Sequence, residues 1–259
     1  NFKMIRRKYD DRPDPPMRLY DLQNDIGETT DVAEQYPEII KKIEDYLKTI
    51  YSLELEESPV STSRIAKARD VKPGSATSMI QRLARLNLVN YQKHYGVSLT
   101  ESGREVALEV IRHHRLVELY LIEALGFSWD EVHEQADILE HVISEELEEK
   151  IAAALDYPSF DPHGDPIPTR EGVVVEVKTL PLTKLPLDTL AVVSRVPDEA
   201  KGEYLRYLAQ LGLIPGSQVI VLEAAPFDGP LTVLVENEEQ ILGYKLASSI
   251  QVEIVGESV

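Results

Sequence analysis

The sequence has no cysteine among its 259 residues, which excludes disulfides, thiolate metal sites and cysteine nucleophiles. It also lacks any apolar run near the length of about eighteen residues that a membrane span needs. The basic start KMIRRK is followed by DDRPDPP rather than by an apolar segment, which does not fit a secretory signal. From these absences we expect a cytoplasmic protein with no membrane partner.

Positive charge is scarce, since the formal net charge is −18 at pH 7. This balance argues against a uniformly basic nucleic-acid binder, because phosphate contacts need positive potential. Residues 58–104 are the exception, with eight Lys or Arg residues against two acidic ones, a net charge of +6. This segment is therefore the candidate surface for an anionic partner.

The order of elements in this basic segment and just before it is informative. Residues 39–56 have the apolar spacing of an amphipathic helix. Next comes a short helix that begins at Thr62, with Ser61 or Thr62 as its cap. It is followed by a turn, a helix over residues 74–86 and a two-stranded hairpin. This is the order of elements in a winged helix-turn-helix. Any small α/β unit remains the alternative.

Candidate metal ligands gather further along the chain. Read as one helix, residues 132–149 place His133, Asp137, Glu140 and His141 on a single face, and His114 and Glu118 form a second pair spaced by four residues. Imidazole and carboxylate groups without sulfur suit a borderline or hard first-row ion. The alternative for any one pair is solvated charge on an exposed helix.

After residue 104 the predicted structure changes twice, from helical to proline-rich and then to strands. Residues 105–155 have helical periodicity throughout, with more apolar positions than thin helices can bury alone, which predicts a dimer interface. Residues 156–172 contain four prolines and read as a semi-rigid linker. From residue 173 onward short strands, including VVVEVK, are interrupted by one helix over residues 197–211, which predicts a small barrel.

Several stretches resemble the diphtheria toxin repressor family of metal-dependent transcriptional regulators. They are EDYLKTIYSLE, GVSLTESGREVA, IRHHRLVELYL, VHEQADILEHVISEELEEKI and DPHGDPIP. The C-terminal segment from YLRYLAQLGLIPG is similar to the SH3-like ferrous iron transport A domain that these regulators often carry. The resemblance implies an α+β fold made of a winged helix-turn-helix, a helical metal-binding and dimerisation domain and an SH3-like β-barrel.

The resemblance also implies two metal sites. The primary site corresponds to Asp45 with Asp137, Glu140 and His141. The ancillary site corresponds to His114, Glu118 and His133, to which Glu203 is a candidate addition from the third domain. Carboxylates at positions 45 and 137 resemble the manganese-sensing branch, so Mn²⁺ or Fe²⁺ is the expected co-repressor. One departure is Lys48, which stands where that branch has a glutamate.

The implied partner is double-stranded palindromic operator DNA, bound by a homodimer. The recognition helix is then the one over residues 74–86, with Ser75, Thr77, Ser78 and Gln81 best placed for base edges. Phosphate contacts are expected from Arg64, Lys72, Arg82, Lys93 and His94.

The first forty residues resemble something else. LYDLQNDIGETTDVAEQYPEI is similar to the C-terminal tail of sulfatases, although the chain has no C/S-x-P-x-R motif that would make an active one. We therefore expect a repressor and not an enzyme, with a metal-dependent hydrolase or sulfatase-related fusion protein as the alternative. The expected parts are an appendage (1–38), the winged domain (39–105), the helical domain (106–156), a Pro-rich linker and strand (157–180) and the SH3-like domain (181–259).

Overall fold

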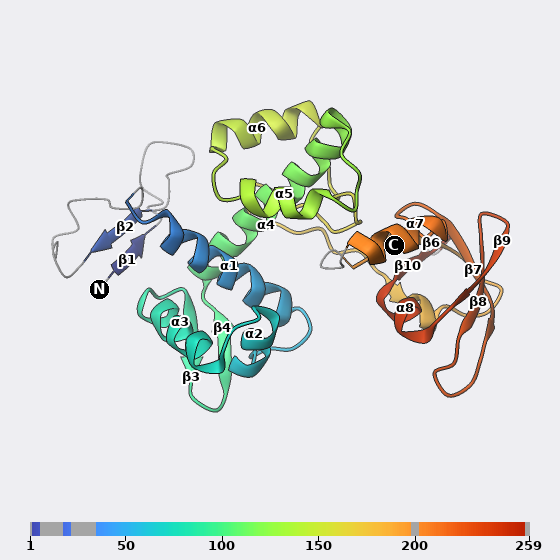
Figure 1. Cartoon of the computed structure of the whole chain (residues 1–259), viewed down its shortest axis with the longest axis horizontal. Helices are drawn as coiled ribbons and strands as arrows, with labels where there is room; N and C mark the ends of the chain where they lie inside the picture. Colours follow the sequence, from blue (N-terminus) through green and yellow to red (C-terminus); the bar gives the residue numbers. More distant parts are fainter. Residues whose placement is uncertain (1, 6–17, 22–34, 198–201, 257–259) are drawn as a thin grey trace. The chain divides into compact units, whose positions relative to one another are not determined.

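A computed structural model describes residues 2–5, 18–21, 35–197 and 202–256 of the chain (Figure 1). The chain forms two compact units, Asn1–Ile111 and Arg112–Val259. At the start of the first unit, strands β1 (Phe2–Ile5) and β2 (Arg18–Asp21) pair antiparallel. Most of the stretch that resembles a sulfatase tail lies outside the described residues, so that resemblance stays a prediction.

The winged helix-turn-helix is confirmed in the first unit. Its order is α1 (Pro37–Glu54), α2 (Thr62–Ala68), α3 (Pro73–Arg85), β3 (Val89–Gln92) and β4 (Gly96–Leu99). Helix α2 begins where Ser61 accepts a hydrogen bond from the Arg64 amide, and Pro73 opens α3, where its missing N–H costs nothing. Val60 adds a bridge to Val97, which widens the wing.

The core of this unit explains the helix spacing. Helix α1 buries Ile43, Leu47 and Ile50, and α2 and α3 contribute Ile65 and Ile80, all fully shielded from solvent. Helix α4 (Glu101–Leu125) starts against the end of the hairpin. There Gly103 lies so close to the Leu88 carbonyl that a Cβ would stand 1.9 Å from its oxygen, so this position requires glycine.

The second unit breaks the expected helix over residues 132–149 in two. Helix α5 (Val132–Leu139) ends with Glu140 as its C-cap, and α6 (Glu145–Ala154) starts only after a turn. The prediction of one continuous helix was therefore wrong. Ser144 is the physical reason, because its extended backbone and its hydroxyl, which accepts from the Leu147 amide, start a new helix.

The C-terminal part of this unit is a six-stranded antiparallel sheet with the order β5-β10-β6-β7-β8-β9. Its strands are β5 (Leu180–Pro181), β6 (Leu190–Arg195), β7 (Gln218–Ala224), β8 (Leu231–Val235), β9 (Glu238–Leu242) and β10 (Gln251–Ile254). The short helix η2 (Leu182–Lys184), α7 (Gly202–Gln210) and α8 (Tyr244–Ser249) complete it. Leu205 and Leu208 of α7 join one hydrophobic core with the strands.

Three features of this C-terminal part differ from expectation. The stretch VVVEVK at residues 173–178 is not a strand, because no described strand pairs with it and alternation alone leaves backbone groups unsatisfied. Strand β9 and helix α8 were not expected, since EEQIL and YKLASS carry weak apolar patterns. The small β-rich domain itself is confirmed.

The helices of the second unit, and the turn between α5 and α6, leave apolar side chains in solvent. Leu125, Ile138, Val142 and Leu147 are 58%, 62%, 73% and 46% exposed. This agrees with the expectation that these helices cannot bury their apolar faces within one chain. Within the described residues, no helix combines the length and the apolar character that crossing a membrane requires.

Candidate metal centre and nucleic-acid interface

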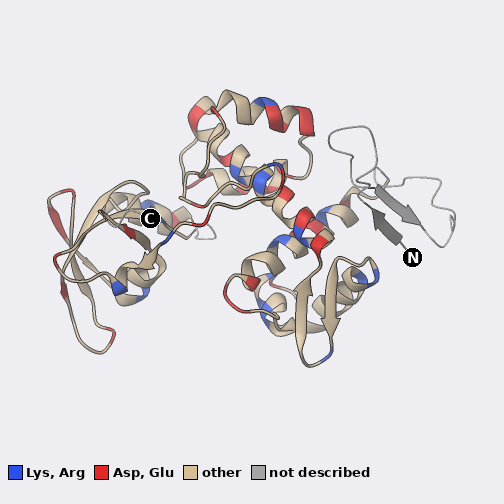
Figure 2. Ribbon diagram, turned by 180° about the vertical axis from the view of Figure 1, so that it is seen from behind, with Lys and Arg blue, Asp and Glu red and all other residues tan. Residues whose placement is uncertain are grey.

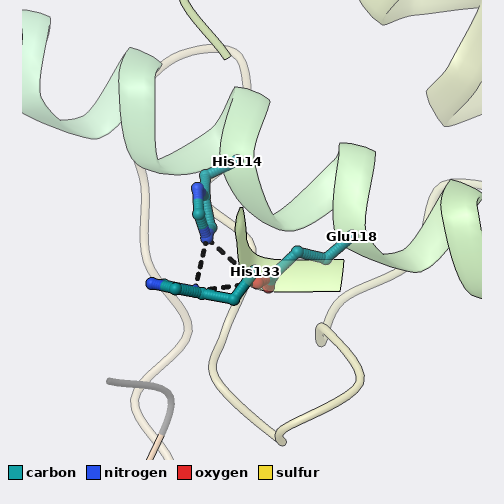
Figure 3. Close-up of side chains that lie close together, drawn as sticks. All are labelled: His114, Glu118 and His133. Atoms are coloured by element: carbon teal, nitrogen blue, oxygen red, sulfur yellow. Dashed lines mark hydrogen bonds and ion pairs between the residues drawn. The ribbon is translucent and has the colours of Figure 1, made fainter. Parts of the chain in front are cut away.

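Two helices bring three potential metal ligands together in the second unit. His114 and Glu118 project from α4 and His133 from α5 (Figure 3). His114 Nε2 lies 3.0 Å from Glu118 Oε1 and 3.1 Å from His133 Nδ1, and His133 Nδ1 lies 3.1 Å from Glu118 Oε1. The three atoms thus form a nearly equilateral triangle.

This triangle is shielded from water. The side chains of His114 and Glu118 are 1% and 0% exposed, whereas that of His133 is 30% exposed. Burial acts to raise the pKa of Glu118, but hydrogen bonds with the surrounding histidines outweigh it and hold the pKa of Glu118 well below its ordinary value. Glu118 is therefore a buried carboxylate anion among imidazoles.

The donor set fits a divalent cation. Bonds of about 2.1 Å to donors at right angles place those donors about 3.0 Å apart, which matches the edges of the triangle. Without a cation, two imidazole nitrogens face each other and must share one carboxylate oxygen. Glu118 Oε2 is also buried and makes no hydrogen bond among the described residues, as expected for a ligand oxygen.

A second group of ligands meets the opposite nitrogen of His114. Its Nδ1 contacts Glu140 Oε2 very closely and lies 3.4 Å from Asp137 Oδ1. The other oxygen of Glu140 lies 3.2 Å from His141 Nε2. Because a carboxylate only accepts, a proton on His114 Nδ1 leaves the Nε2 lone pair directed at the triangle, which strengthens His114 as a ligand.

Most of the expected ligands therefore lie together, although not on one face of one helix. His133 and Asp137 belong to α5, Glu140 caps it, and His141 follows in the turn before α6. The helix break supplies this arrangement, which differs from the continuous helix that was expected.

The other two expected ligands lie on elements other than α4, α5 and the turn that follows α5. Asp45 lies on α1 of the first unit, where its Oδ2 accepts a hydrogen bond from Arg69 Nη2 at 2.8 Å. Glu203 lies exposed on α7 and belongs to none of the described groups of potential ligands. Both assignments stay predictions.

The sequence reasoning missed two residues at the centre. Asp161 and His163 follow α6 and form a third group of potential ligands with Glu118. His163 is fully buried, and its Nδ1 lies 3.7 Å from Glu118 Oε2. The motif DPHGDPIP contained both residues, but it was read as a linker because of its prolines.

The loop that carries His163 is tightly held. His163 stacks on Trp129 with the ring centroids 5.6 Å apart, and its carbonyl accepts from the Val196 amide. At Gly164, with φ +87°, a Cβ would stand 1.9 Å from the Ser194 carbonyl oxygen. This segment therefore packs against β6 and is held more firmly than the semi-rigid linker that its prolines predicted.

The candidate base-reading residues lie on α3 of the first unit. Ser75, Ser78 and Gln81 are exposed, whereas Thr77 is half-buried. The Thr77 hydroxyl donates to the Pro73 carbonyl at 2.9 Å, so it is engaged within its own helix. Three of the four side chains are thereby available to a partner.

The candidate phosphate-binding residues differ in their present partners. Lys72, Lys93 and His94 are exposed, the last two in the wing turn, and Figure 2 shows basic segments on the helices and the wing of this unit. Arg64 pairs with Glu56 and Glu57 at 2.5 and 3.0 Å, which reduces its potential at the surface.

Arg82 lies beside another cation on the same helix. Burial and then the charge of Arg85 lower the pKa of Arg82. Like charges crowded on the helix that carries the candidate base-reading residues favour an anionic partner.

Comparison with known protein families accounts for most of the chain. Residues 38–97 match the model of the iron dependent repressor N-terminal DNA binding domain, and residues 100–169 match that of the iron dependent repressor metal binding and dimerisation domain. Residues 180–254 match the FeoA domain.

Individual proteins show similarity over the same range. The chain is 32% identical over 229 residues to the iron-dependent repressor IdeR of Mycobacterium bovis, covering 84% of this chain and 99% of that protein. It is 34% identical over 131 residues to the diphtheria toxin repressor of Corynebacterium jeikeium, covering 51% of this chain and 55% of that protein.

Solved structures are similar as well. A manganese-dependent transcriptional repressor in complex with manganese has 36% identity and a TM-score of 0.77, covering 82% of this chain and all of that one. The manganese regulator SloR has 31% identity and a TM-score of 0.69, covering 82% and 98%.

Proposed function

The chain belongs to the iron-dependent repressor family, and from this premise we propose how its residues couple a metal ion to DNA. It is a metal-dependent DNA-binding transcriptional repressor and not an enzyme, with Mn²⁺ or Fe²⁺ as co-repressor. The observation that carries the proposal is the buried triangle of His114, Glu118 and His133, whose edges match a divalent cation.

Two metal sites are proposed, and they lie on opposite sides of the His114 ring. His114, Glu118 and His133 form the ancillary site, and Asp161 and His163 extend its donors beyond Glu118. Asp137, Glu140 and His141 supply the primary site from the second unit, and Asp45 completes it from the first unit. Oxygen and nitrogen donors without sulfur make Mn²⁺ competitive with ions that bind more tightly elsewhere.

The bound ion supplies positive charge that a set of carboxylates and imidazoles from two units can share. Asp45 lies on the first helix of the DNA-binding unit, and Glu140 and His141 lie beside the apolar helices of the dimerisation unit. A metal ion held by ligands from both units would restrict the angle between them. Metal affinity and DNA affinity are then coupled reciprocally.

The DNA partner follows from two-fold symmetry. A homodimer presents two α3 helices, whose separation must match half-sites about 34 Å apart, one turn of DNA, or a multiple of it. The operator is therefore proposed to be palindromic. Ser75, Ser78 and Gln81 read base edges, while Lys72 and Lys93 position the protein on phosphates. A repressor of this kind acts in the cytoplasm, where the DNA is.

The alternative, a metal-dependent hydrolase or sulfatase-related protein, is not favoured. The family consists of DNA-binding repressors, and the basic α3 and wing have no role in a hydrolase. Catalytic metal sites keep one coordination position open for water or substrate. Asp137 and Glu140 also lie near His114, so the protein can fill more of the positions around an ion here.

Removal of one ligand tests the proposal. We expect His141→Ala to reduce Mn²⁺-stimulated DNA binding at least tenfold in an electrophoretic shift assay, because one donor of the primary site is lost. Glu134→Ala, at an exposed position of α5 outside the proposed ligand set, is the control, and its response to Mn²⁺ should persist. Equal stimulation of the wild-type protein and His141→Ala by Mn²⁺ would remove His141 from the site.

A further inference from the structure

Asp45 has a cationic partner within its own unit. Arg69, the C-cap of α2, donates from Nη2 to Asp45 Oδ2 at 2.8 Å. The Arg69 guanidinium also lies over the Tyr46 ring, 5.6 Å from its centroid. The side chains of Asp45 and Arg69 are 19% and 31% exposed, so this pair is partly withdrawn from water.

A carboxylate in such a place needs a compensating charge. An ionised group that loses most of its hydration is costly unless it is paired and hydrogen-bonded. Arg69 supplies that charge when no metal does. The Tyr46 ring holds the guanidinium in place through a cation–π contact.

We propose that Arg69 is a built-in competitor of the metal ion for Asp45, and that it sets the metal concentration at which this repressor responds. The inference rests on the proposed role of Asp45 as a ligand of the primary site. It adds a second function for the same carboxylate, which exchanges a guanidinium partner for a metal ion.

Electrostatics gives the direction of the effect. An ion bound to either oxygen of Asp45 lies within about 7 Å of the Arg69 Nη2 atom, given metal–oxygen bonds of about 2.1 Å. This separation is below the Debye length of about 8 Å at physiological salt, so repulsion between the two cations is only partly screened. Arg69 must therefore weaken metal binding. A residue that merely positioned Asp45 would strengthen it.

The test is the affinity of the full chain for Mn²⁺, measured without DNA by calorimetry and by electron paramagnetic resonance of free Mn²⁺. Omitting DNA matters because Arg69 also contributes positive charge to the DNA-binding unit. We expect Arg69→Met to bind Mn²⁺ roughly tenfold more tightly than the wild-type chain. Arg69→Lys keeps the charge and should stay near the wild-type affinity.

The chain offers a matched control. Arg104 pairs with Glu54 at 3.0 Å and lies 5.4 Å from the centroid of the Tyr51 ring, which reproduces the surroundings of Arg69 away from Asp45. Arg104→Met loses the same charge and should leave Mn²⁺ affinity within about twofold of the wild-type value.

The outcomes separate this inference from the function on which it rests. Asp45→Ala identifies the class of Mn²⁺ sites that depends on Asp45. If Asp45→Ala weakens binding while Arg69→Met weakens it too or leaves it unchanged, the competition is refuted and the ligand role of Asp45 stands. If Asp45→Ala binds Mn²⁺ like the wild-type chain, Asp45 is no ligand and both claims fall.

Discussion

Glu148 is a buried carboxylate on α6, only 4% exposed, with two cationic partners on α4. Arg112 Nε donates to its Oε1 and His113 Nε2 lies 3.1 Å from its Oε2. The other nitrogen of His113 lies 3.1 Å from the Glu140 carbonyl oxygen. Because both neighbours of the His113 ring accept hydrogen bonds, His113 carries both protons when Glu148 is ionised. This pair therefore supports the turn that presents Glu140.

Burial acts to raise the pKa of Glu148, but the His113 hydrogen bond and the charges of Arg112 and His113 outweigh it, so the pKa is lowered. A lowered pKa in the folded state stabilises the fold above the unfolded pKa of about 4.3, and that contribution is lost as the pH falls through the folded pKa. We expect Glu148→Gln to reduce the free energy of unfolding at pH 7 by about 3 kcal/mol.

The pH dependence distinguishes this charge effect from a packing effect. In urea titrations the difference between the wild-type protein and Glu148→Gln should shrink as the pH falls from about 5 toward about 3, through the lowered folded pKa of Glu148. Glu149→Gln is the control on the same helix. A difference that stayed constant over this range would mean that the ionised form of Glu148 contributes nothing special.

At the scale of elements, the break between α5 and α6 positions two residues of the candidate metal centre. Ser144 accepts from the Leu147 amide at 3.3 Å and starts α6, so Glu140 and His141 fall in the turn before it. We expect Ser144→Ala to reduce the free energy of unfolding by about 1 kcal/mol, as for other lost N-caps. Ser144→Asp retains an acceptor and should recover most of the loss. Thermal unfolding followed by circular dichroism measures both, and equal losses in the two variants would show that capping is not the cause.

The elements also show what periodicity can reveal. Strong stripes such as Ile43, Leu47 and Ile50 predicted α1 and the winged unit correctly, because burial on one helix face leaves its trace in the sequence. The same periodicity wrongly predicted one continuous helix over residues 132–149, because the apolar positions continue across the break and the cap at Ser144 was overlooked. The strand predicted over residues 173–178 was wrong because a strand needs a pairing partner, which the local sequence pattern does not reveal.

For the candidate site as well, the sequence predicted ligands that are close along the chain but not those that the fold brings together. Pairs separated by one helical turn, such as His114 and Glu118, were evident from spacing alone. Asp161 and His163 were not, because only the packing of their loop on β6 brings them to Glu118. Arg69 was counted only as one of the basic residues of the segment 58–104, and its pairing with Asp45 depends on how α2 meets α1.

At the scale of the whole molecule, the proposed function requires metal binding in the second unit to affect DNA binding by the first. The basic segment over residues 58–104 belongs to a chain with a net charge of −18, so its approach to DNA is opposed by the remaining acidic surface. The proposed ligand role of Asp45 would give the bound metal ion a means to favour DNA binding. The domain limits at residues 38, 105, 156 and 180 stay predictions, as does the separate origin of the first 38 residues.

The central claim is that metal binding by this chain controls its affinity for DNA. The most direct measurement is a fluorescence anisotropy titration of a labelled duplex from the region upstream of its own gene, with the wild-type protein in excess Mn²⁺, in excess Fe²⁺ without oxygen, and in chelator. We predict tight binding with either ion and at least a hundredfold weaker binding in chelator, which corresponds to a coupling of about 2.7 kcal/mol. Equal affinity with metal and with chelator would contradict the account.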